Sequence, residues 1–267
     1  MCPQDNLDII MHKITNKQMI GENFKRLEVQ APNIARTAKP GQFVMVMVDE
    51  DSDRIPLAVV ESDERRGVIT LVFEEVGPVT KSLGEKQIGS FLFALTGPLG
   101  MPIEVKKVGT VVCIAEGANT AQILPICRSL KKAGNKVISI VGVKTKKKLT
   151  LESHLRSASY KLLVLTEDGS YEKRGMPINI LGKVLKEEDV DLVYVFGSVE
   201  LLRSVTAITK KEKIKTLVGL SPVMVDGLGL CGSCRVRVGD REVFACTDGP
   251  IFNGHDVDFD YLKARMA

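Results

Sequence analysis

Three cysteines and one aspartate near the C-terminus have side chains that bind metals, and their spacing follows a recognisable pattern. Asp226, Cys231, Cys234 and Cys246 form the pattern D-x4-C-x2-C-x11-C. Plant-type ferredoxins space their cluster ligands as C-x4-C-x2-C with a distant fourth cysteine, so the aspartate stands where the first cysteine is expected. The spacing therefore predicts a [2Fe-2S] cluster at this end of the chain.

Glycines surround these cysteines and suit a cluster-binding loop. Gly227, Gly229 and Gly232 can adopt positive φ, which brings backbone N–H groups close to the sulfur atoms of a cluster. Zinc is an alternative, because the three cysteines with either Asp226 or His255 would give a tetrahedral site. Structural zinc usually uses two paired ligand motifs, whereas the last cysteine stands alone here. A third interpretation is that the cysteines bind no metal.

Length and composition fit a soluble protein of about two domains with a small appendage. The 267 residues are 44% hydrophobic and 26% charged, and no apolar run approaches the roughly 18 residues of a membrane span. The 37 basic and 33 acidic residues are too balanced for a nucleic-acid-binding protein. No secretory signal is visible, and the clustering of cysteines favours metal binding over disulfides. We expect a cytoplasmic protein that binds neither nucleic acid nor membrane.

The first hundred residues predict an antiparallel β domain. Short runs of β-branched and aromatic residues are separated by glycine and proline, which favours a barrel or a sandwich. The expected strands are 8–15, 24–32, 42–48, 56–62, 67–76 and 90–97. One short helix is expected near residues 80–83, with Thr80 as its N-cap.

After Gly100, strands and helices alternate, which predicts a parallel sheet covered by helices on both faces. The expected strands are 110–115, 136–143, 161–166, 191–196 and 214–220, and the expected helices are 119–134, 151–158, 177–187 and 198–210. Ligands of such sheets bind at the carboxyl ends of the strands. Glu116-Gly117, Asp168-Gly169 and Gly197-Ser198 are therefore expected around one crevice.

From Ser221 this alternation ends, and a hairpin with its turn at Gly239-Asp240 is expected. We therefore divide the chain into residues 1–100, 101–220 and 221–267. These three parts are predicted to be an antiparallel β-barrel domain, an α/β domain with a parallel sheet, and a small segment that carries the cysteines.

The chain resembles the small subunits of NADH-dependent ferredoxin:NADP oxidoreductases, which are also described as sulfide dehydrogenase beta subunits. The similarity is carried by PGQFVMV at 40–46, RIPLA at 54–58, TGPLG at 96–100, TEDGSY at 166–171 and the segment from Pro222 onward. More distantly, the chain resembles the electron-transfer subunit of dihydroorotate dehydrogenase B, which uses four cysteines. Both groups are ferredoxin-reductase-like.

This resemblance implies cofactors and a partner. It implies one FAD and one [2Fe-2S] cluster held by one aspartate and three cysteines, which assigns Asp226, Cys231, Cys234 and Cys246 as ligands. It also implies a large partner subunit that carries another FAD and [4Fe-4S] clusters. An exposed apolar surface near residues 221–267 is expected where that partner docks.

For the flavin, the family pattern R-x-P-[LI]-[ST] corresponds to residues 54–58. Arg54 would offer positive charge to a phosphate, and Pro56 would stiffen the strand edge beside the flavin ring. Leu57 keeps the pattern, whereas Ala58 lacks the hydroxyl that the family places near the ring. Further flavin positions implied by the resemblance are Val72, Phe73, Val79 and Thr80.

For NAD(P), the resemblance and the residues disagree. The implied positions are Gly117, Asp168, Gly169 and Gly197. The family has a turn rich in glycine after the first strand of the α/β domain, and residues 115–122 keep only Gly117. Glu116 would also place a carboxylate beside an anionic ligand, which weighs against NAD(P) binding.

Together these observations predict an electron-transfer flavoprotein subunit of an oxidoreductase complex. It would pass electrons between a pyridine nucleotide, ferredoxin or a partner subunit and an iron–sulfur chain, through FAD and the [2Fe-2S] cluster. No catalytic side chain is predicted. The alternatives are an electron relay that has lost NAD(P) binding, and a zinc-stabilised binding or regulatory module on a reductase-like scaffold.

Overall fold

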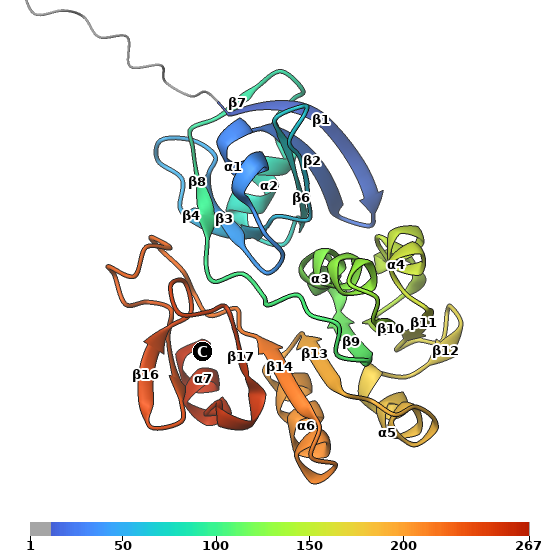
Figure 1. Cartoon of the computed structure of the whole chain (residues 1–267). Helices are drawn as coiled ribbons and strands as arrows, with labels where there is room; N and C mark the ends of the chain where they lie inside the picture. The colour runs from blue at the N-terminus through green and yellow to red at the C-terminus, as the bar shows by residue number, and fades with distance from the viewer. Residues whose placement is uncertain (1–11, 267) are drawn as a thin grey trace, which may run out of the picture.

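Antiparallel strands in the N-terminal part form two sheets around a common apolar core (Figure 1). The computed structural model describes residues 12–266, so the first four residues of the predicted strand 8–15 lie outside the described part. The larger sheet has the order β5-β6-β2-β1-β7, with bounds Glu61–Asp63, Val68–Glu74, Phe24–Gln30, His12–Gly21 and Phe91–Leu92. The smaller sheet has the order β4-β3-β8, with bounds Arg54–Ala58, Phe43–Met47 and Ala94–Leu99.

Alternation along β3 divides its side chains between two cores. Val44 and Val46 point into the core between the two sheets, where they pack with Leu27 and Leu71. Met45 points to the opposite face and packs with the C-terminal segment. Because buried apolar surface contributes about 25 cal/mol per Å², both cores stabilise the position of β3. The predicted antiparallel architecture is confirmed.

Two helices interrupt these strands. Helix α1 (Pro32–Thr37) was not predicted, and it begins with a proline, which loses no hydrogen bond at the first helical position. Helix α2 spans Pro78–Glu85, and its N-cap is Gly77 rather than the predicted Thr80. The Thr80 hydroxyl lies one turn inside the helix and accepts a hydrogen bond from the backbone N–H of Gly77 at 3.0 Å. The prediction of Thr80 as N-cap was therefore wrong by three positions.

The central sheet within residues 12–266 has seven strands in the order β12-β11-β10-β9-β13-β14-β17. All neighbours pair in parallel except β14 and β17, which are antiparallel. The bounds in this order are Lys173–Arg174, Lys161–Thr166, Lys136–Val143, Thr110–Glu116, Leu192–Phe196, Lys215–Gly219 and Ile251–Asn253. The predicted parallel sheet is confirmed, with two strands that were not predicted, β12 and, from the C-terminal segment, β17.

Helices cover both faces of this sheet (Figure 1). They are α3 Thr120–Lys132, α4 Glu152–Ala158, α5 Pro177–Glu187 and α6 Val199–Lys211, and the single-turn helices η1, η2 and η3 span Gly117–Asn119, Lys146–Lys148 and Gly254–Asp256. On β9, Val111 and Cys113 pack beneath α3 and α4, whereas Val112 and Ile114 pack toward α5 and α6. Among the helices of residues 12–266, none is both long enough and apolar enough to cross a membrane.

The C-terminal segment joins the two larger parts. Its hairpin consists of β15 (Arg235–Val238) and β16 (Arg241–Phe244), and the turn lies at the predicted Gly239-Asp240. Helix α7 (Phe259–Met266) follows. The buried side chains of Cys234 and Cys246 belong to the same apolar core as Met45 of β3. The cysteines are thus held between the antiparallel sheets and the central sheet.

Candidate functional site

Asp226 organises the loop that precedes the first cysteine of the pattern. Its carboxylate accepts hydrogen bonds from the backbone N–H groups of Leu228 and Leu230, at 2.7 and 3.1 Å. A third bond, 2.6 Å long, comes from the backbone N–H of Cys231. These hydrogen bonds, with that from Leu228 foremost, lower the pKa of Asp226. The amides of this loop therefore converge on negative charge, which fits a loop that binds an anionic cluster.

The three cysteines differ in their exposure. The sulfur atoms of Cys234 and Cys246 lie 3.2 Å apart, and both side chains are buried. Burial and the neighbouring thiol raise the pKa of Cys246 to about 12. Cys231 is exposed, and a hydrogen bond with the hydroxyl of Ser233 lowers its pKa. The structure thus brings two of the four predicted ligands together and places the other two on the adjoining loop.

Further observations limit the alternatives for these residues. Within residues 12–266, no group of three or more His, Cys, Asp or Glu side chains is positioned to hold a metal ion. The five cysteines in this range are all free. The ring nitrogen Nε2 of His255 lies 3.3 Å from the hydroxyl of Thr209, in a buried group with Thr216. His255 therefore makes its polar contact with a hydroxyl, which gives no support to its role as a fourth zinc ligand.

The predicted flavin strand β4 lies at the edge of its sheet, where a proline costs no ladder hydrogen bond. Pro56 pairs with Met45, and Ala58 pairs with Phe43. Leu57 packs against the core between the two sheets, and Arg54 is exposed at the start of the strand. Pro56 and Ala58 also line a cavity of about 120 Å³, together with Gly41, Gln42, Phe43, Gln122, Pro125, Phe196, Leu220, Ser221, Met224 and Pro250.

Of the other predicted flavin positions, Val72 and Phe73 are buried, whereas Val79 and Thr80 are partly exposed. Phe73 is 3% exposed and packs in the core between the antiparallel sheets, whereas Val72 points to the opposite face, beneath α3. Their side chains are therefore occupied by protein contacts, and only their backbone atoms are available to a flavin. Val79 and Thr80 lie in the first turn of α2, where Thr80 hydrogen-bonds with Gly77.

A second cavity, of about 430 Å³, lies at the carboxyl ends of the central strands. It is lined by Glu74, Glu116, Gly117, Ala118, Asn119, Gly142, Val143, Lys144, Glu167, Gly175, Met176, Pro177 and Ser198. The predicted crevice therefore contains Gly117, while Gly197 adjoins it through Ser198. Asp168 and Gly169 are not among its lining residues, because Asp168 folds into a local turn and accepts hydrogen bonds from the N–H and hydroxyl of Ser170.

Glu116 makes the closest polar contact across this crevice. One of its carboxylate oxygens accepts hydrogen bonds from the hydroxyl and the backbone N–H of Ser198, at 2.9 and 3.1 Å. Glu116 ends β9 and Ser198 precedes α6, so this contact joins the ends of two neighbouring strands. Sequence reasoning placed Glu116 in the crevice but did not predict this contact.

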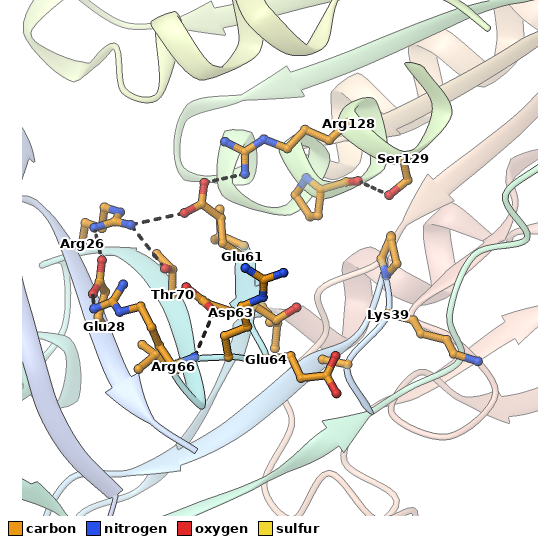
Figure 2. Close-up of a pocket in the computed structure, with 18 residues that line it drawn as sticks. Arg26, Glu28, Lys39, Glu61, Asp63, Glu64, Arg66, Thr70, Arg128 and Ser129 are labelled. Atoms are coloured by element: carbon orange, nitrogen blue, oxygen red, sulfur yellow. Dashed lines mark hydrogen bonds and ion pairs between the residues drawn. The ribbon is translucent and has the colours of Figure 1, made fainter. Parts of the chain in front are cut away.

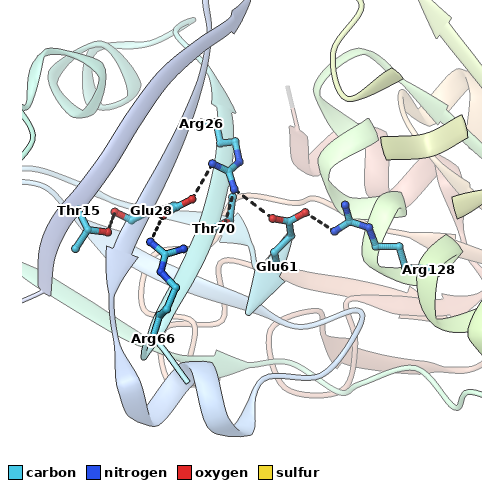
Figure 3. Close-up of polar contacts among 7 residues, drawn as sticks. All are labelled: Thr15, Arg26, Glu28, Glu61, Arg66, Thr70 and Arg128. Carbon is cyan, nitrogen blue, oxygen red and sulfur yellow. Dashed lines mark hydrogen bonds and ion pairs between the residues drawn. The ribbon is translucent and has the colours of Figure 1, made fainter. Parts of the chain in front are cut away.

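A third cavity, of about 760 Å³, lies between the edge of the antiparallel sheet and helix α3 (Figure 2). A chain of ion pairs crosses it (Figure 3). Arg66 and Arg26 contact Glu28 at 2.7 and 2.9 Å. Arg26 also contacts Glu61 at 3.2 Å, and Glu61 is paired with Arg128 of α3. The three arginines exceed the two glutamates by one positive charge, and the ion pairs link β5 to α3 across the cavity.

Sequence reasoning did not predict this ion-pair chain. Burial opposes the ionisation of Glu28, but hydrogen bonds from Arg66 and Arg26 outweigh it and lower the pKa of Glu28. The pKa of Glu61 is lowered in the same way by Arg128 and Arg26. The partners come from four separate elements, and no local sequence pattern brings such residues together.

Comparison with known proteins identifies the C-terminal segment. The model of the iron-sulfur cluster binding domain of dihydroorotate dehydrogenase B matches residues 221–258. This match covers all four residues of the pattern that begins at Asp226. It favours the iron–sulfur prediction over the zinc alternative.

Similar proteins cover nearly the whole chain. A homolog of the electron transfer subunit of dihydroorotate dehydrogenase B (NAD(+)) from Thermotoga maritima is 34% identical, over 96% of this chain and 91% of its own length. A chain in the structure of the NADH-dependent reduced ferredoxin-NADP oxidoreductase, studied for flavin-based electron bifurcation, has a TM-score of 0.91 and 33% identity. The match covers 93% of that chain and 96% of the chain described here.

A more distant structure supports the fold alone. Phthalate dioxygenase reductase has a TM-score of 0.60 at 14% identity, covering 86% of each chain. The predicted resemblance and the predicted fold class are both confirmed by these comparisons. The chain belongs to the family of electron-transfer subunits of dihydroorotate dehydrogenase B and their homologues, which are subunits of oxidoreductases.

Proposed function

We propose that this chain is an electron-transfer subunit that binds FAD beside β4 and a [2Fe-2S] cluster in its C-terminal segment. The observation that carries the proposal is the cavity of about 120 Å³ described above. Pro56 and Ala58 of the predicted flavin strand line one side of it, and Met224, two residues before Asp226, lines another. One apolar space therefore touches both the flavin strand and the cluster segment, as required for electron transfer between the two groups.

The residues around this cavity would position the flavin. Phe43 and Phe196 supply aromatic walls, and Arg54 supplies a charged group at the exposed end of β4. Ala58 offers no hydroxyl, so the ring would receive no side-chain hydrogen bond from this position. Val72, Phe73, Val79 and Thr80 would contribute mainly backbone contacts, for the reasons given by their burial and capping.

Asp226, Cys231, Cys234 and Cys246 would hold the cluster. FAD can accept electrons in pairs and release them one at a time, whereas a [2Fe-2S] cluster accepts only one, so together the two groups would convert two-electron transfer into one-electron transfer. The backbone amides that converge on Asp226 would stabilise the negative charge of the bound cluster. Cys234 and Cys246 would shield its inner side from water, because both are buried.

A partner subunit is part of the proposal. Leu228 is 48% exposed and Leu230 is 83% exposed, on the loop that carries Cys231. Exposed large apolar side chains beside a redox centre support docking of a protein at this point. The family resemblance suggests a large subunit with its own FAD and [4Fe-4S] clusters, with ferredoxin or NAD(P)H as more distant electron partners. The division into residues 1–100, 101–220 and 221–267 and a cytoplasmic location belong to the same proposal.

An electron relay without NAD(P) binding is the second candidate. The contact of Glu116 with Ser198 favours it, since this contact places a carboxylate in the nucleotide-type crevice. In that case Gly117, Asp168, Gly169 and Gly197 would have only structural roles.

Cofactor analysis tests the proposal. The protein, purified without oxygen, is expected to show flavin absorption with a broad iron–sulfur band, and to contain iron and acid-labile sulfide in equal amounts. Flavin released by denaturation should be FAD by chromatography. A colourless protein that contains zinc, or one that contains neither iron nor flavin, would refute the proposal.

A further inference from the structure

Glu116 and Ser198 lie on opposite sides of the point where the strand order of the central sheet reverses. From β9, the chain proceeds to β10 and β11 on one side, and then to β13 and β14 on the other. In open parallel sheets, ligands bind in the crevice outside the carboxyl ends of the two strands at this point. Glu116 is the last residue of β9. Only Gly197 separates Ser198 from Phe196, the last residue of β13.

The Glu116 carboxylate closes this point with hydrogen bonds. One oxygen accepts from the Ser198 hydroxyl at 2.9 Å and from the Ser198 backbone N–H at 3.1 Å. The Ser198 hydroxyl oxygen in turn accepts from the backbone N–H of Leu201 at 3.2 Å, which makes Ser198 the N-cap of α6. The carboxylate thus supplies negative charge at the positive end of a 13-residue helix. The phosphate of a ligand would be stabilised by the same groups.

Gly197 makes room for this arrangement. A Cβ atom at position 197 would lie 2.9 Å from the same carboxylate oxygen of Glu116 and 2.8 Å from the side chain of Leu201. Any larger residue would therefore push the carboxylate away from Ser198. The crevice is therefore closed by the Glu116 carboxylate, and Gly197 leaves the space that this carboxylate occupies.

The charges that line the crevice also oppose an anion. Glu74, Glu116 and Glu167 line the cavity, whereas Lys144 is its one lining cation among the described residues. Glu74 is paired with Lys148, so these two charges offset each other, and Glu116 and Glu167 remain against Lys144. A pyrophosphate would meet a carboxylate at the strand ends and little free positive charge to offset it.

We propose that Glu116 is a specificity-determining residue that keeps pyridine dinucleotides out of this chain. Its carboxylate takes the place that the phosphates of a dinucleotide would occupy between β9 and α6. If the proposed function is correct, electrons then reach the flavin from a protein partner rather than from a nucleotide bound here. The exclusion of nucleotide depends only on the protein, so it can be tested apart from the cofactors.

Isothermal titration of the full chain with NADH and with NADPH tests the proposal. The wild-type protein should show no saturable binding up to about 1 mM. Glu116→Gly and Glu116→Gln should each bind at least about tenfold more tightly, since both remove the charge. Glu167→Gln is the matched control, because Glu167 lines the same cavity and has no polar contact with Ser198. It should bind as weakly as the wild type.

Three results would overturn the proposal. They are micromolar binding of either nucleotide by the wild type, unchanged binding in both Glu116 variants, and equal gains from Glu167→Gln and Glu116→Gln. Circular dichroism should establish that each variant is folded, and Glu116→Gln serves where glycine perturbs the turn. FAD and iron contents are measured on the same samples. Absence of FAD and iron from the wild-type protein would contradict the proposed function. The nucleotide titration, by contrast, decides the role of Glu116.

Discussion

The sulfur atoms of Cys234 and Cys246 lie 3.2 Å apart in the protein core, at the two ends of the hairpin β15–β16. The backbone N–H of Ala245 donates to the carbonyl of Cys234 at 3.0 Å and closes the hairpin at this level. The hairpin register places Cys234 opposite Ala245, and Cys246 is the next residue, in the turn that follows β16, so the hairpin and this turn together bring the thiols close. The fold of the chain therefore brings these two predicted ligands together.

Replacement of one thiol of this pair should remove the cluster. Cys246→Ala is expected to lower the iron content by at least about tenfold, since even indirect supports of a metal site contribute about 10–100-fold. Iron and sulfide analysis with electron paramagnetic resonance measures this. Cys127→Ala is the control, because Cys127 is a buried cysteine of helix α3, outside the predicted ligand set, and its replacement should leave the iron content unchanged. Full iron in Cys246→Ala would exclude Cys246 as a ligand.

Asp226 should set the potential of the cluster. A carboxylate is a harder donor than a thiolate, so Asp226→Cys should retain the cluster but shift its midpoint potential. A redox titration followed by electron paramagnetic resonance gives the potential and the spectrum. Asp240→Asn, in the hairpin turn, should change neither. An unchanged potential and spectrum in Asp226→Cys would show that Asp226 acts only through its hydrogen bonds within the loop.

Gly227→Ala should destabilise the packing of the cluster loop on β3. Gly227 has φ +75°, and an added Cβ would lie 2.5 Å from the side chain of Met45. The free energy of unfolding should fall by about 2–4 kcal/mol, from backbone strain and the clash together. Gly239→Ala is matched, because Gly239 has φ +59° and no atom within 4 Å of an added Cβ. It should cost about 1–2 kcal/mol in urea unfolding. Equal losses would mean that the Met45 contact relaxes freely.

The chain of ion pairs should make the free energy of unfolding depend on pH. Burial opposes the ionisation of Glu61, but Arg128 and Arg26 outweigh it and hold its pKa below the usual 4.5. The carboxylate therefore contributes stability that is present above about pH 4.5 and lost as the pH falls through the lower folded-state pKa. Glu61→Gln should cost about 1–3 kcal/mol at pH 7 and less near pH 3.

Urea unfolding at both pH values measures this effect. Glu187→Gln is a suitable control, because its pair with Lys183 is exposed on α5 and should contribute less than about 0.5 kcal/mol. A constant difference between wild type and Glu61→Gln across this pH range would contradict the role of charge in the Glu61 contacts.

Leu230 should anchor the partner subunit. Leu230→Glu is expected to weaken association at least about tenfold, because it places a charge at the centre of the exposed apolar loop. Calorimetry or co-purification with the partner measures this, and the unfolding free energy of the isolated chain should hardly change. Met19→Glu, on the exposed side of β1, should leave association intact. Equal weakening by both variants would move the interface away from the cluster loop.

Patterns of neighbouring residues in the sequence predicted most of the turns, strands and helices. The hairpin turn at Gly239-Asp240, and the strands and helices of the central sheet other than β12 and β17, followed from turn residues and from hydrophobic periodicity. Helix α1 was missed because Pro32 resembled a turn signal, although proline is equally suited to begin a helix. Thr80 has the chemistry of a cap, and the structure places it one turn further into α2.

Contacts between distant elements could not be predicted. Glu61 and Arg128 are 67 positions apart, and only the packing of α3 on β5 and β6 brings them together. The same is true of Glu116 and Ser198, whose residue types suggested a crevice but not a mutual hydrogen bond. Asp168 was predicted in that crevice by its place after a strand, yet its turn with Ser170 satisfies it locally.

Strand β17 gives the iron–sulfur segment a protective role. It pairs antiparallel with β14 and covers what would otherwise be an open edge of the parallel sheet. Uncovered strand edges recruit strands from other molecules and lead to aggregation. Unfolding of the segment would therefore do more than stop electron flow, because it would expose the edge of β14 to pairing with strands of other molecules.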